Sequence, residues 1–295
     1  MIQIRGTTQL LGVIGCPIEH SLSPVMHNAA LATRGLNLNQ VALEYVYLPL
    51  KVESAHLEAA LKGMAALGYQ GFNVTIPHKQ AIMPYLQAIS PLAQAVGAVN
   101  TVSRQGDRWV GTNTDVQGFV SPLMALNQPW HNTEVCILGG GGSARAVIAG
   151  CHQIRCAAIH VVGRDLLKLK ALQKSLLQAE LQISVQIHEW SALDALLPQV
   201  GLVVTTTPIG MHPKVDASPL GEKEIALLSQ NAIVYDLIYT PRPTRLLAIA
   251  QQKHFQTIDG LEMLIQQGAA AFELWTGDKP SIDVMRQAAL EALVQ

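Results

Sequence analysis

Lys79 is the residue whose neighbours most suggest chemistry. It ends the segment GFNVTIPHK, residues 71–79, in which apolar residues alternate with Asn73 and Thr75. This period-two alternation is typical of a β-strand with two different faces. Asn73 and Thr75 are therefore expected on one polar face beside Lys79, where amide and hydroxyl groups can hold a polyhydroxylated ligand. An ordinary strand end with a solvated lysine is the alternative, and this segment alone does not exclude it.

A pair of hydroxyl groups follows the first apolar segment, LLGVIG at 10–15. Ser21 and Ser23 lie in the polar loop CPIEHSLSPVMHN. The loop follows the carboxyl end of a predicted strand, where open α/β sheets bind ligands. Pro24 can begin a helix there, which we expect to end at Gly35. A serine can simply cap that helix; capping accounts for Ser23 and leaves Ser21 for a ligand.

The segment GGGGSARA, residues 139–146, predicts a dinucleotide-binding turn. It follows the strand-like segment 134–138 and fits G-x-G-x-x-A with Gly139, Gly141 and Ala144. Small residues at these positions permit a tight turn, close approach of a pyrophosphate, and close packing of helix on strand. The N–H groups and the positive dipole end of the following helix favour phosphates.

The residues after the next strand indicate which dinucleotide is preferred. NAD-binding folds place an acidic residue there for the ribose 2′-hydroxyl, but this chain has Gly163 followed by Arg164. Arg164 can stack on adenine and form paired hydrogen bonds with a 2′-phosphate, and Lys168 adds positive charge. Asp165 either opposes that phosphate or caps the next helix. We favour capping, and therefore NADP over NAD.

Alternating strand-like and helix-like segments must position these residues. Such alternation is typical of α/β folds with parallel sheets and right-handed crossovers. Strands are expected at 10–15, 41–48, 71–79, 97–102, 108–112, 134–138, 157–162, 200–206, 232–238 and 255–258. Residues 105–107 predict a hairpin turn. Helices are expected at 56–63, 116–126, 245–253, 260–275 and 284–294.

Composition excludes several classes of protein. The 295 residues are 49% hydrophobic and 14% charged, which predicts a sizeable core. The net charge of −1 argues against a nucleic-acid partner, and no apolar run approaches the roughly 18 residues that span a bilayer. The cysteines and histidines lack metal-binding spacings, so we expect free thiols and no metal site. The first residues lack a signal-peptide layout, so we expect a cytoplasmic protein.

Seven segments together resemble the shikimate dehydrogenase family. They are CPIEHSLSPVMHN, GFNVTIPHK, GAVNT, GTNTD, GGGGSARA, TTTPIGM and DGLEMLIQQGAAAFELWTG, and they extend over nearly the whole chain. The resemblance implies reduction of 3-dehydroshikimate to shikimate with NADPH, in aromatic amino-acid biosynthesis. It also implies a small-molecule substrate and a monomer or homodimer.

The resemblance implies two α/β domains. Residues 1–114 and 260–295 would form a substrate domain, in which C-terminal helices complete a mostly parallel N-terminal sheet. Residues 115–259 would form a Rossmann-type NADP-binding domain. The polar segment 127–133 also indicates a boundary in this region.

The resemblance also implies roles for individual residues. The catalytic pair would be Lys79 and Asp115. The substrate shell would contain Ser21, Ser23, Asn73, Thr75, Asn100, Gln267 and Tyr239. The cofactor would contact Gly139, Gly140, Gly141, Gly142, Ser143, Ala144, Gly163, Arg164, Lys168, Thr206, Ile238, Gly260 and Met263.

Two positions depart from the family pattern. Gly163-Arg164-Asp165 stands where the family often has Asn-Arg-Thr, and Thr205 where it often has Asn. The first departure leaves open an NAD-using quinate/shikimate dehydrogenase, in which Asp165 would bind the free 2′-hydroxyl. A non-catalytic pathway sensor is a further alternative, but such a protein would be expected to have lost Lys79 or Asp115.

Overall fold

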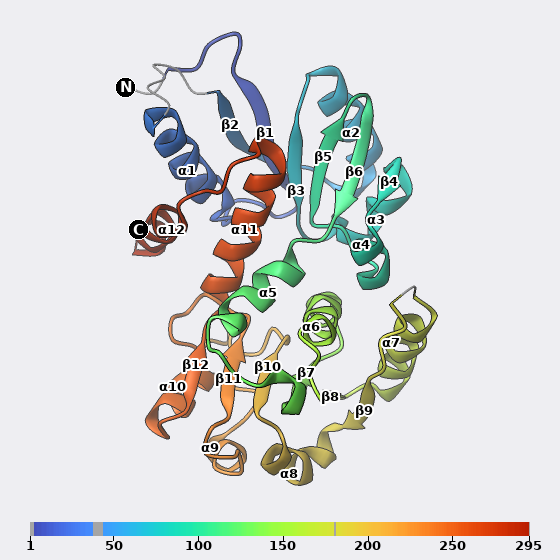
Figure 1. Cartoon of the computed structure of the whole chain (residues 1–295), viewed down its shortest axis with the longest axis vertical. Helices are drawn as coiled ribbons and strands as arrows, with labels where there is room; N and C mark the ends of the chain where they lie inside the picture. The colour runs from blue at the N-terminus through green and yellow to red at the C-terminus, as the bar shows by residue number, and fades with distance from the viewer. Residues whose placement is uncertain (1–2, 38–43, 180, 295) are drawn as a thin grey trace. The chain divides into compact units, whose positions relative to one another are not determined.

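The computed structural model describes residues 3–37, 44–179 and 181–294. The chain divides into two compact units (Figure 1). Unit 1 comprises Met1–Thr114 and Ile265–Gln295, and unit 2 comprises Asp115–Leu264. Within the described residues, each unit is built around a six-stranded sheet. The α/β class expected from the sequence is confirmed.

The sheet of unit 1 is mixed. Its strands, in spatial order, are β2 (Tyr45–Lys51), β1 (Gln9–Gly15), β3 (Gly71–Val74), β5 (Thr101–Gln105), β6 (Arg108–Thr112) and β4 (Ala88–Ile89). Strand β1 is parallel to β2 and β3, and β4 is parallel to β6, whereas β5 is antiparallel to both its neighbours. Strands β5 and β6 form the predicted hairpin, and Gly106 supplies the left-handed turn residue with a φ of 61°.

Helices cover both faces of this sheet. Phe72 and Val74 lie in one apolar cluster with residues of α2 (Leu57–Ala66) and α4 (Pro91–Val96). Gly71 and Asn73 face the opposite side because side chains alternate along a strand. That side is covered by α1 (Ser23–Asn37) and the unit 1 part of α11 (Gly260–Thr276), and α12 (Ile282–Val294) lies beside α1 (Figure 1).

The C-terminal helices are attached to the N-terminal sheet by direct contacts. Trp275 Nε1 donates a hydrogen bond of 3.0 Å to the carbonyl oxygen of Val102 in β5. Gly71 permits this approach, because a Cβ atom there would lie 2.1 Å from Trp275 Nε1. The expectation that C-terminal helices complete the N-terminal sheet is therefore confirmed.

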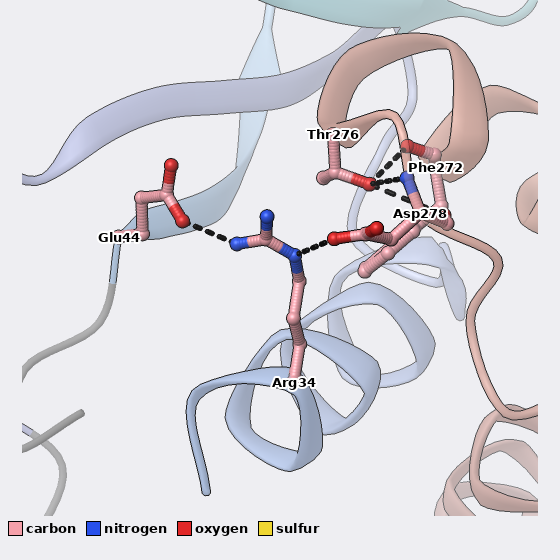
Figure 2. A network of polar contacts seen from close by, with 5 residues as sticks. All are labelled: Arg34, Glu44, Phe272, Thr276 and Asp278. Atoms are coloured by element: carbon pink, nitrogen blue, oxygen red, sulfur yellow. Dashed lines mark hydrogen bonds and ion pairs between the residues drawn. The ribbon is translucent and has the colours of Figure 1, made fainter. Parts of the chain in front are cut away.

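A polar network fixes the same helices at the far end of α1 (Figure 2). Arg34 forms ion pairs with Glu44, just before β2, and with Asp278, just after α11. Its Nε lies 2.8 Å from Asp278 Oδ2. Thr276 Oγ1 donates to the carbonyl oxygen of Phe272 at 3.0 Å and accepts from the Asp278 N–H at 3.2 Å. The network thus connects α1, β2 and the turn between α11 and α12.

Unit 2 contains an entirely parallel sheet among its described residues. Its spatial order is β12 (Gln256–Ile258), β11 (Ile233–Asp236), β10 (Leu202–Thr205), β7 (Glu134–Leu138), β8 (Ala158–Gly163) and β9 (Gln186–Glu189). The first strand of this sheet, β7, lies in the middle. The next two, β8 and β9, extend the sheet to one edge, and β10 then lies on the other side of β7. This reversal of order is the switch point at which Rossmann-type sheets bind dinucleotides.

Helices cover both faces of the second sheet as well. Val234 packs in a cluster with α8 (Leu193–Leu196), α9 (Glu222–Ile225) and α10 (Arg245–Gln252). The next residue, Tyr235, stacks on Phe119 of α5 (Asp115–Met124) with ring centres 5.3 Å apart. Phe119 in turn lies against Gly150 of α6 (Gly142–Gln153). Helix α7 (Leu166–Gln178) follows β8.

Some predicted boundaries were wrong. Helix α1 continues through Gly35 to Asn37, because one glycine lowers helix stability without ending a packed helix. Strand β3 ends at Val74, and Ile76 is 70% exposed. The strand predicted from Gly97 begins only at Thr101, since Gly97 ends α4 in the left-handed conformation with a φ of 69°.

Two other strands differ from the prediction. Part of the strand predicted at 41–48 lies outside the described residues, and β2 is found at Tyr45–Lys51. Strand β9 (Gln186–Glu189) was missed. Among the described strands it pairs only with β8, at the sheet edge, and its sequence QIHE lacks the continuous apolar run of a central strand.

Candidate active site

Lys79 lies at the predicted junction of strand and helix. It is the second residue of α3 (His78–Ala81), a single turn that follows β3 after Thr75, Ile76 and Pro77. Its carbonyl oxygen accepts the Val99 N–H at 2.8 Å. The neighbouring His78 is fully buried, with Nε2 2.6 Å from the carbonyl oxygen of Val52. Both contacts fix the main chain that carries the half-buried Lys79.

Asn73, Asn100 and Gln267 meet in one buried polar network. Asn73 Nδ2 donates to the Asn100 carbonyl oxygen at 3.2 Å and to Thr101 Oγ1 at 3.0 Å. Asn100 Nδ2 donates to Gln267 Oε1 at 3.3 Å and to Thr114 Oγ1 at 3.0 Å, and Asn100 Oδ1 accepts the Thr114 N–H at 2.7 Å. The fold therefore brings together three predicted shell residues from β3, the segment before β5, and α11.

The two serines have different environments from those expected. Ser21 Oγ accepts the Ser23 N–H at 3.4 Å at the start of α1. The prediction that Ser23 performs the capping and leaves Ser21 unengaged was therefore wrong. Ser23 is 7% exposed, and its hydroxyl partly opposes the rise that burial causes in the pKa of the nearby Tyr47 phenol. Tyr47 was not singled out from the sequence, and only the alternation in EYVYL marks it as facing one side of a strand.

Thr75 lies where the carboxyl ends of β1 and β3 meet. Its N–H donates to the carbonyl oxygen of Ile14 at 3.0 Å, and its own carbonyl oxygen accepts the His78 N–H at 2.9 Å. Its methyl group closely approaches Gly15, where a Cβ atom would lie 2.4 Å from Thr75 Cγ2. Gly15 therefore makes room for Thr75 at the predicted ligand-binding edge of the sheet.

Asp115 and Tyr239 belong to unit 2. Asp115 begins α5 and directly follows Thr114, whose N–H binds Asn100. Tyr239 is half-buried in the segment after β11, and burial raises the pKa of its phenol.

The segment after β11 is held by Asp236, which sequence reasoning missed. Asp236 is fully buried. Its Oδ1 accepts the Ile238 N–H at 3.1 Å and its Oδ2 accepts the Thr244 hydroxyl at 2.7 Å. Burial raises the pKa of the Asp236 carboxyl to about 6. In the sequence, the only sign of this role is an acidic residue at the end of an apolar strand.

Gly260 approaches the same segment closely. Its N–H donates to the Ile238 carbonyl oxygen at 3.2 Å. A Cβ atom at Gly260 would lie 2.0 Å from the carbonyl oxygen of Leu237, so no other residue fits without moving the main chain. Met263 lies one turn further along α11 and is half-buried. Gly260, Ile238 and Met263 are thus brought together as predicted cofactor residues.

The glycine-rich turn has the geometry that a dinucleotide requires. Gly139 has a φ of 105°, and a Cβ there would lie 2.8 Å from Thr206 Oγ1. Thr206 Oγ1 itself donates to the Leu138 carbonyl oxygen at 3.0 Å. At Gly141 a Cβ atom would meet nothing within 4 Å, so the main chain is open to a close ligand. Ala144 is fully buried in α6, which provides the close packing expected at the third small position.

The candidate cofactor site also contains the remaining residues of the turn and the residues at and after the end of β8. Gly140, Gly142 and Ser143 are exposed, and α6 begins at Gly142 without a side-chain cap. Gly163 is buried, whereas Arg164 and Lys168 are exposed.

Asp165 is the N-cap of α7. Its Oδ1 accepts the Lys168 N–H at 3.1 Å. That backbone hydrogen bond is the main cause that lowers the pKa of the Asp165 carboxyl. The capping interpretation of Asp165 is confirmed.

Similarity to known proteins identifies the family. A family model described as "Shikimate dehydrogenase substrate binding domain" matches residues 13–102, and one described as "Shikimate 5'-dehydrogenase C-terminal domain" matches residues 260–290. The chain is 54% identical over 287 residues to the shikimate dehydrogenase (NADP(+)) of Trichormus variabilis, covering 97% of each chain. The chain belongs to the shikimate dehydrogenase family.

Solved structures of shikimate dehydrogenases share the fold. One, crystallised in complex with NADP+, is 38% identical with a TM-score of 0.89, and the match covers 100% of this chain and 99% of that one. Another, from Thermus thermophilus in complex with NADP(H) and shikimate, is 33% identical with a TM-score of 0.84 over 97% of this chain and all of the other. These likenesses confirm the expected pairing of a substrate-domain fold with a Rossmann fold.

The described part of the chain lacks two kinds of feature. No group of three or more histidine, cysteine or acidic residues within it is arranged to hold a metal ion. Within the same residues, every helix is too short or too polar to cross a bilayer.

Proposed function

We propose that this chain interconverts 3-dehydroshikimate and shikimate, with NADP as the redox cofactor, in aromatic amino-acid biosynthesis. The observation that carries the proposal is the buried network of Asn73, Asn100 and Gln267 beside the main chain of Lys79. Convergent amide and hydroxyl groups suit a small ring that bears several hydroxyls. The 54% identity to a shikimate dehydrogenase (NADP(+)) supports the same activity.

Lys79 is the proposed acid–base residue. NADPH, when bound, supplies the hydride that reduces the C3 ketone. Negative charge then develops on the ketone oxygen, where the Lys79 ammonium group stabilises it and donates a proton. The carbonyl thus gains one hydride and one proton and becomes the C3 hydroxyl. Asp115 is proposed to orient Lys79 and to accept a hydrogen bond from that hydroxyl; in the oxidative direction Lys79 accepts the proton.

The remaining shell residues are proposed to bind the rest of the ring. Ser21, Ser23 and Thr75 stand at the carboxyl ends of β1 and β3, where α/β sheets bind ligands. Gln267 joins them from α11, and Tyr239 is proposed to border the nicotinamide and substrate. Residues that bind ring substituents equally well in the substrate and in the transition state contribute mainly to substrate affinity.

Unit 2 has residues that fit NADP. The open main chain at Gly141 and the uncapped start of α6 suit the pyrophosphate. Arg164 and Lys168 are the proposed ligands of the 2′-phosphate. Because the Asp165 side chain is engaged in capping α7, the NAD-specific role of an acid at this position is disfavoured. NADP is therefore favoured over NAD.

The two units are proposed to divide the ligands between them. Unit 1 contains Lys79 and six of the seven predicted shell residues, and unit 2 contains Asp115, Tyr239 and every predicted cofactor residue. We therefore propose unit 1 as the substrate domain and unit 2 as the NADP domain.

Turnover of shikimate by the purified protein tests the function. We expect the absorbance of the reduced nicotinamide to appear with shikimate and NADP, and much more slowly when NAD replaces NADP or quinate replaces shikimate. Lys79→Ala should lower kcat by roughly 10²- to 10⁴-fold, the usual contribution of a positioned acid–base group, while shikimate still binds. Lys62→Ala is the matched control, because Lys62 is an exposed lysine on α2 of the same unit. Near-normal turnover by the Lys79 variant would remove it from the mechanism, and a wild type inactive on shikimate would refute the function.

Two properties stay predictions from the sequence. The protein is proposed to be cytoplasmic, and to be a monomer or a homodimer. Light scattering coupled to size-exclusion chromatography measures the second property directly.

A further inference from the structure

Tyr47 is held rigidly between helix α1 and strand β2. Its side chain is 1% exposed, and its ring stacks on His27 with centres 4.3 Å apart and planes within 10°. Asn28, the next residue of α1, binds the Tyr47 main chain twice: Nδ2 donates to the carbonyl oxygen at 2.8 Å, and Oδ1 accepts the N–H at 3.0 Å. Ring and main chain are both fixed, so the position of the Tyr47 hydroxyl is fixed as well.

That hydroxyl binds one of the proposed substrate residues. Tyr47 Oη lies 2.7 Å from Asn73 Oδ1. The Asn73 amide can be oriented in only one way, because its Nδ2 faces the carbonyl oxygen of Asn100, which can only accept. Asn73 Oδ1 therefore accepts, and the single hydrogen of the Tyr47 hydroxyl is donated to it.

This hydrogen bond continues into the rest of the buried network. Asn73 Nδ2 donates in turn to the Asn100 carbonyl oxygen and to Thr101 Oγ1. A directed chain of hydrogen bonds thus runs from Tyr47 on β2, through Asn73 on β3, to Asn100 and Thr101.

Loss of the Tyr47 hydroxyl would disturb Asn73. Asn73 is 5% exposed, so its Oδ1 would lose a buried donor that solvent does not readily replace. The Asn73 amide would then be held by its Nδ2 contacts alone. Fully connected buried networks fix orientation, and partly satisfied ones lose it.

We propose that Tyr47 is a positioning residue for the substrate, which sets the orientation of Asn73 and so the affinity for shikimate. The inference rests on the proposed function. Tyr47 is too buried to contact substrate itself, so it acts through Asn73. Because Asn73 is proposed to bind a part of the ring that hydride transfer leaves unchanged, the effect belongs to KM more than to kcat.

Tyr47→Phe, compared with Tyr45→Phe, tests the assignment. Tyr45 lies two residues earlier on the same face of β2 and is 9% exposed, but its ring faces Arg34. We expect Tyr47→Phe to raise KM for shikimate roughly 5- to 100-fold, the effect of leaving a buried polar group unsatisfied. The kcat and the KM for NADP should change less than about twofold. Tyr45→Phe should leave all three constants unchanged.

A double-mutant cycle separates positioning from a merely structural role. If Tyr47 acts through Asn73, the KM increases of Asn73→Ala and Tyr47→Phe will not multiply in the double variant, and the shortfall should be about threefold or more. A Tyr47→Phe protein that is less stable but keeps its KM, or increases that multiply fully, would overturn the assignment. An inactive wild type would overturn the proposed function itself, and is distinguished from these results by the first assay.

Discussion

At the residue scale, the choice of cofactor depends on two adjacent side chains with opposite charges. Arg164 is exposed beside the end of β8, whereas Asp165 is engaged at the start of α7. A side chain that caps a helix is held toward the main-chain N–H groups of that helix. Arg164 is therefore the residue of this pair expected to meet the 2′-substituent of the ribose.

Arg164→Ala should weaken NADP selectively. We expect KM for NADP to rise roughly 10- to 100-fold, the value of a hydrogen bond to a charged group, with little change in KM for NAD. Lys170→Ala is the control, because it removes an exposed positive charge from α7, the helix that follows Arg164. Equal losses for the two cofactors would indicate instead that Arg164 only stacks on adenine.

The burial of His27 makes the stability of the fold depend on pH in the acid range. It is fully buried, and neither ring nitrogen has a hydrogen-bond partner among the described residues. Burial lowers the pKa of His27 to about 3, from the ordinary value of 6.5. The unfolded chain therefore binds this proton more tightly than the folded chain, and stability is lost as pH falls below 6.5 toward 3.

His27→Phe should remove this acid sensitivity. One pKa unit corresponds to about 1.4 kcal/mol, so between pH 7 and pH 5 the variant should gain about 2 kcal/mol in free energy of unfolding relative to wild type. Asp236, with its raised pKa, contributes in the opposite direction but is present in both proteins and cancels. Urea unfolding at the two pH values measures the difference. If variant and wild type differ by the same free energy of unfolding at both pH values, the difference reflects repacking alone. That result would contradict the titration of His27.

At the element scale, α11 depends on one glycine in β3. A Cβ atom at Gly71 would lie 2.1 Å from Trp275 Nε1 and 2.8 Å from the Val102 carbonyl oxygen. These are the two partners of the hydrogen bond that attaches α11 to β5. Any side chain at Gly71 must therefore displace the helix from the sheet, and with it Gln267.

Gly71→Ala should destabilise unit 1 by about 2 to 4 kcal/mol, through overpacking and loss of the Trp275 hydrogen bond. Gly63→Ala is the matched control. Gly63 lies within α2, and a Cβ there would meet nothing within 4 Å, so alanine should stabilise by about 0.5 to 1 kcal/mol. Denaturation curves of both variants test the contrast; equal stabilities would contradict the role of Gly71.

At the scale of the whole molecule, the chain leaves unit 1 at Thr114 and returns at Ile265. Each unit has its own sheet and its own apolar clusters. A ligand that binds one unit should therefore suppress local unfolding in that unit more than in the other.

Hydrogen exchange with single ligands should separate the two units. NADP alone should slow amide exchange at 139–146 and 163–168, and shikimate alone should slow it at 71–79 and 97–102. Exchange in the β9 segment, 186–189, serves as an internal control, because no ligand contact is predicted there. Protection of 71–79 by NADP and of 139–146 by shikimate would reverse the proposed roles of the units.

The sequence by itself determined the features that depend on local pattern. The strand, glycine turn and helix at 134–153 followed from apolar periodicity and from small residues that few other folds require at that spacing. The cap at Asp165 and the hairpin around Gly106 were equally local. Such features involve residues that are close in the chain, so their types and spacing are enough to predict them.

Only the tertiary structure decided which polar groups meet. Asn100 and Gln267 are 167 residues apart, and their hydrogen bond exists because α11 packs on the first sheet. The partners of Tyr47 lie on α1 and β3, and those of Asp236 depend on how the chain turns after β11. Hydrogen bonds are short-ranged and directional, so a sequence pattern can name the donors and acceptors, but packing of distant elements selects the pairs.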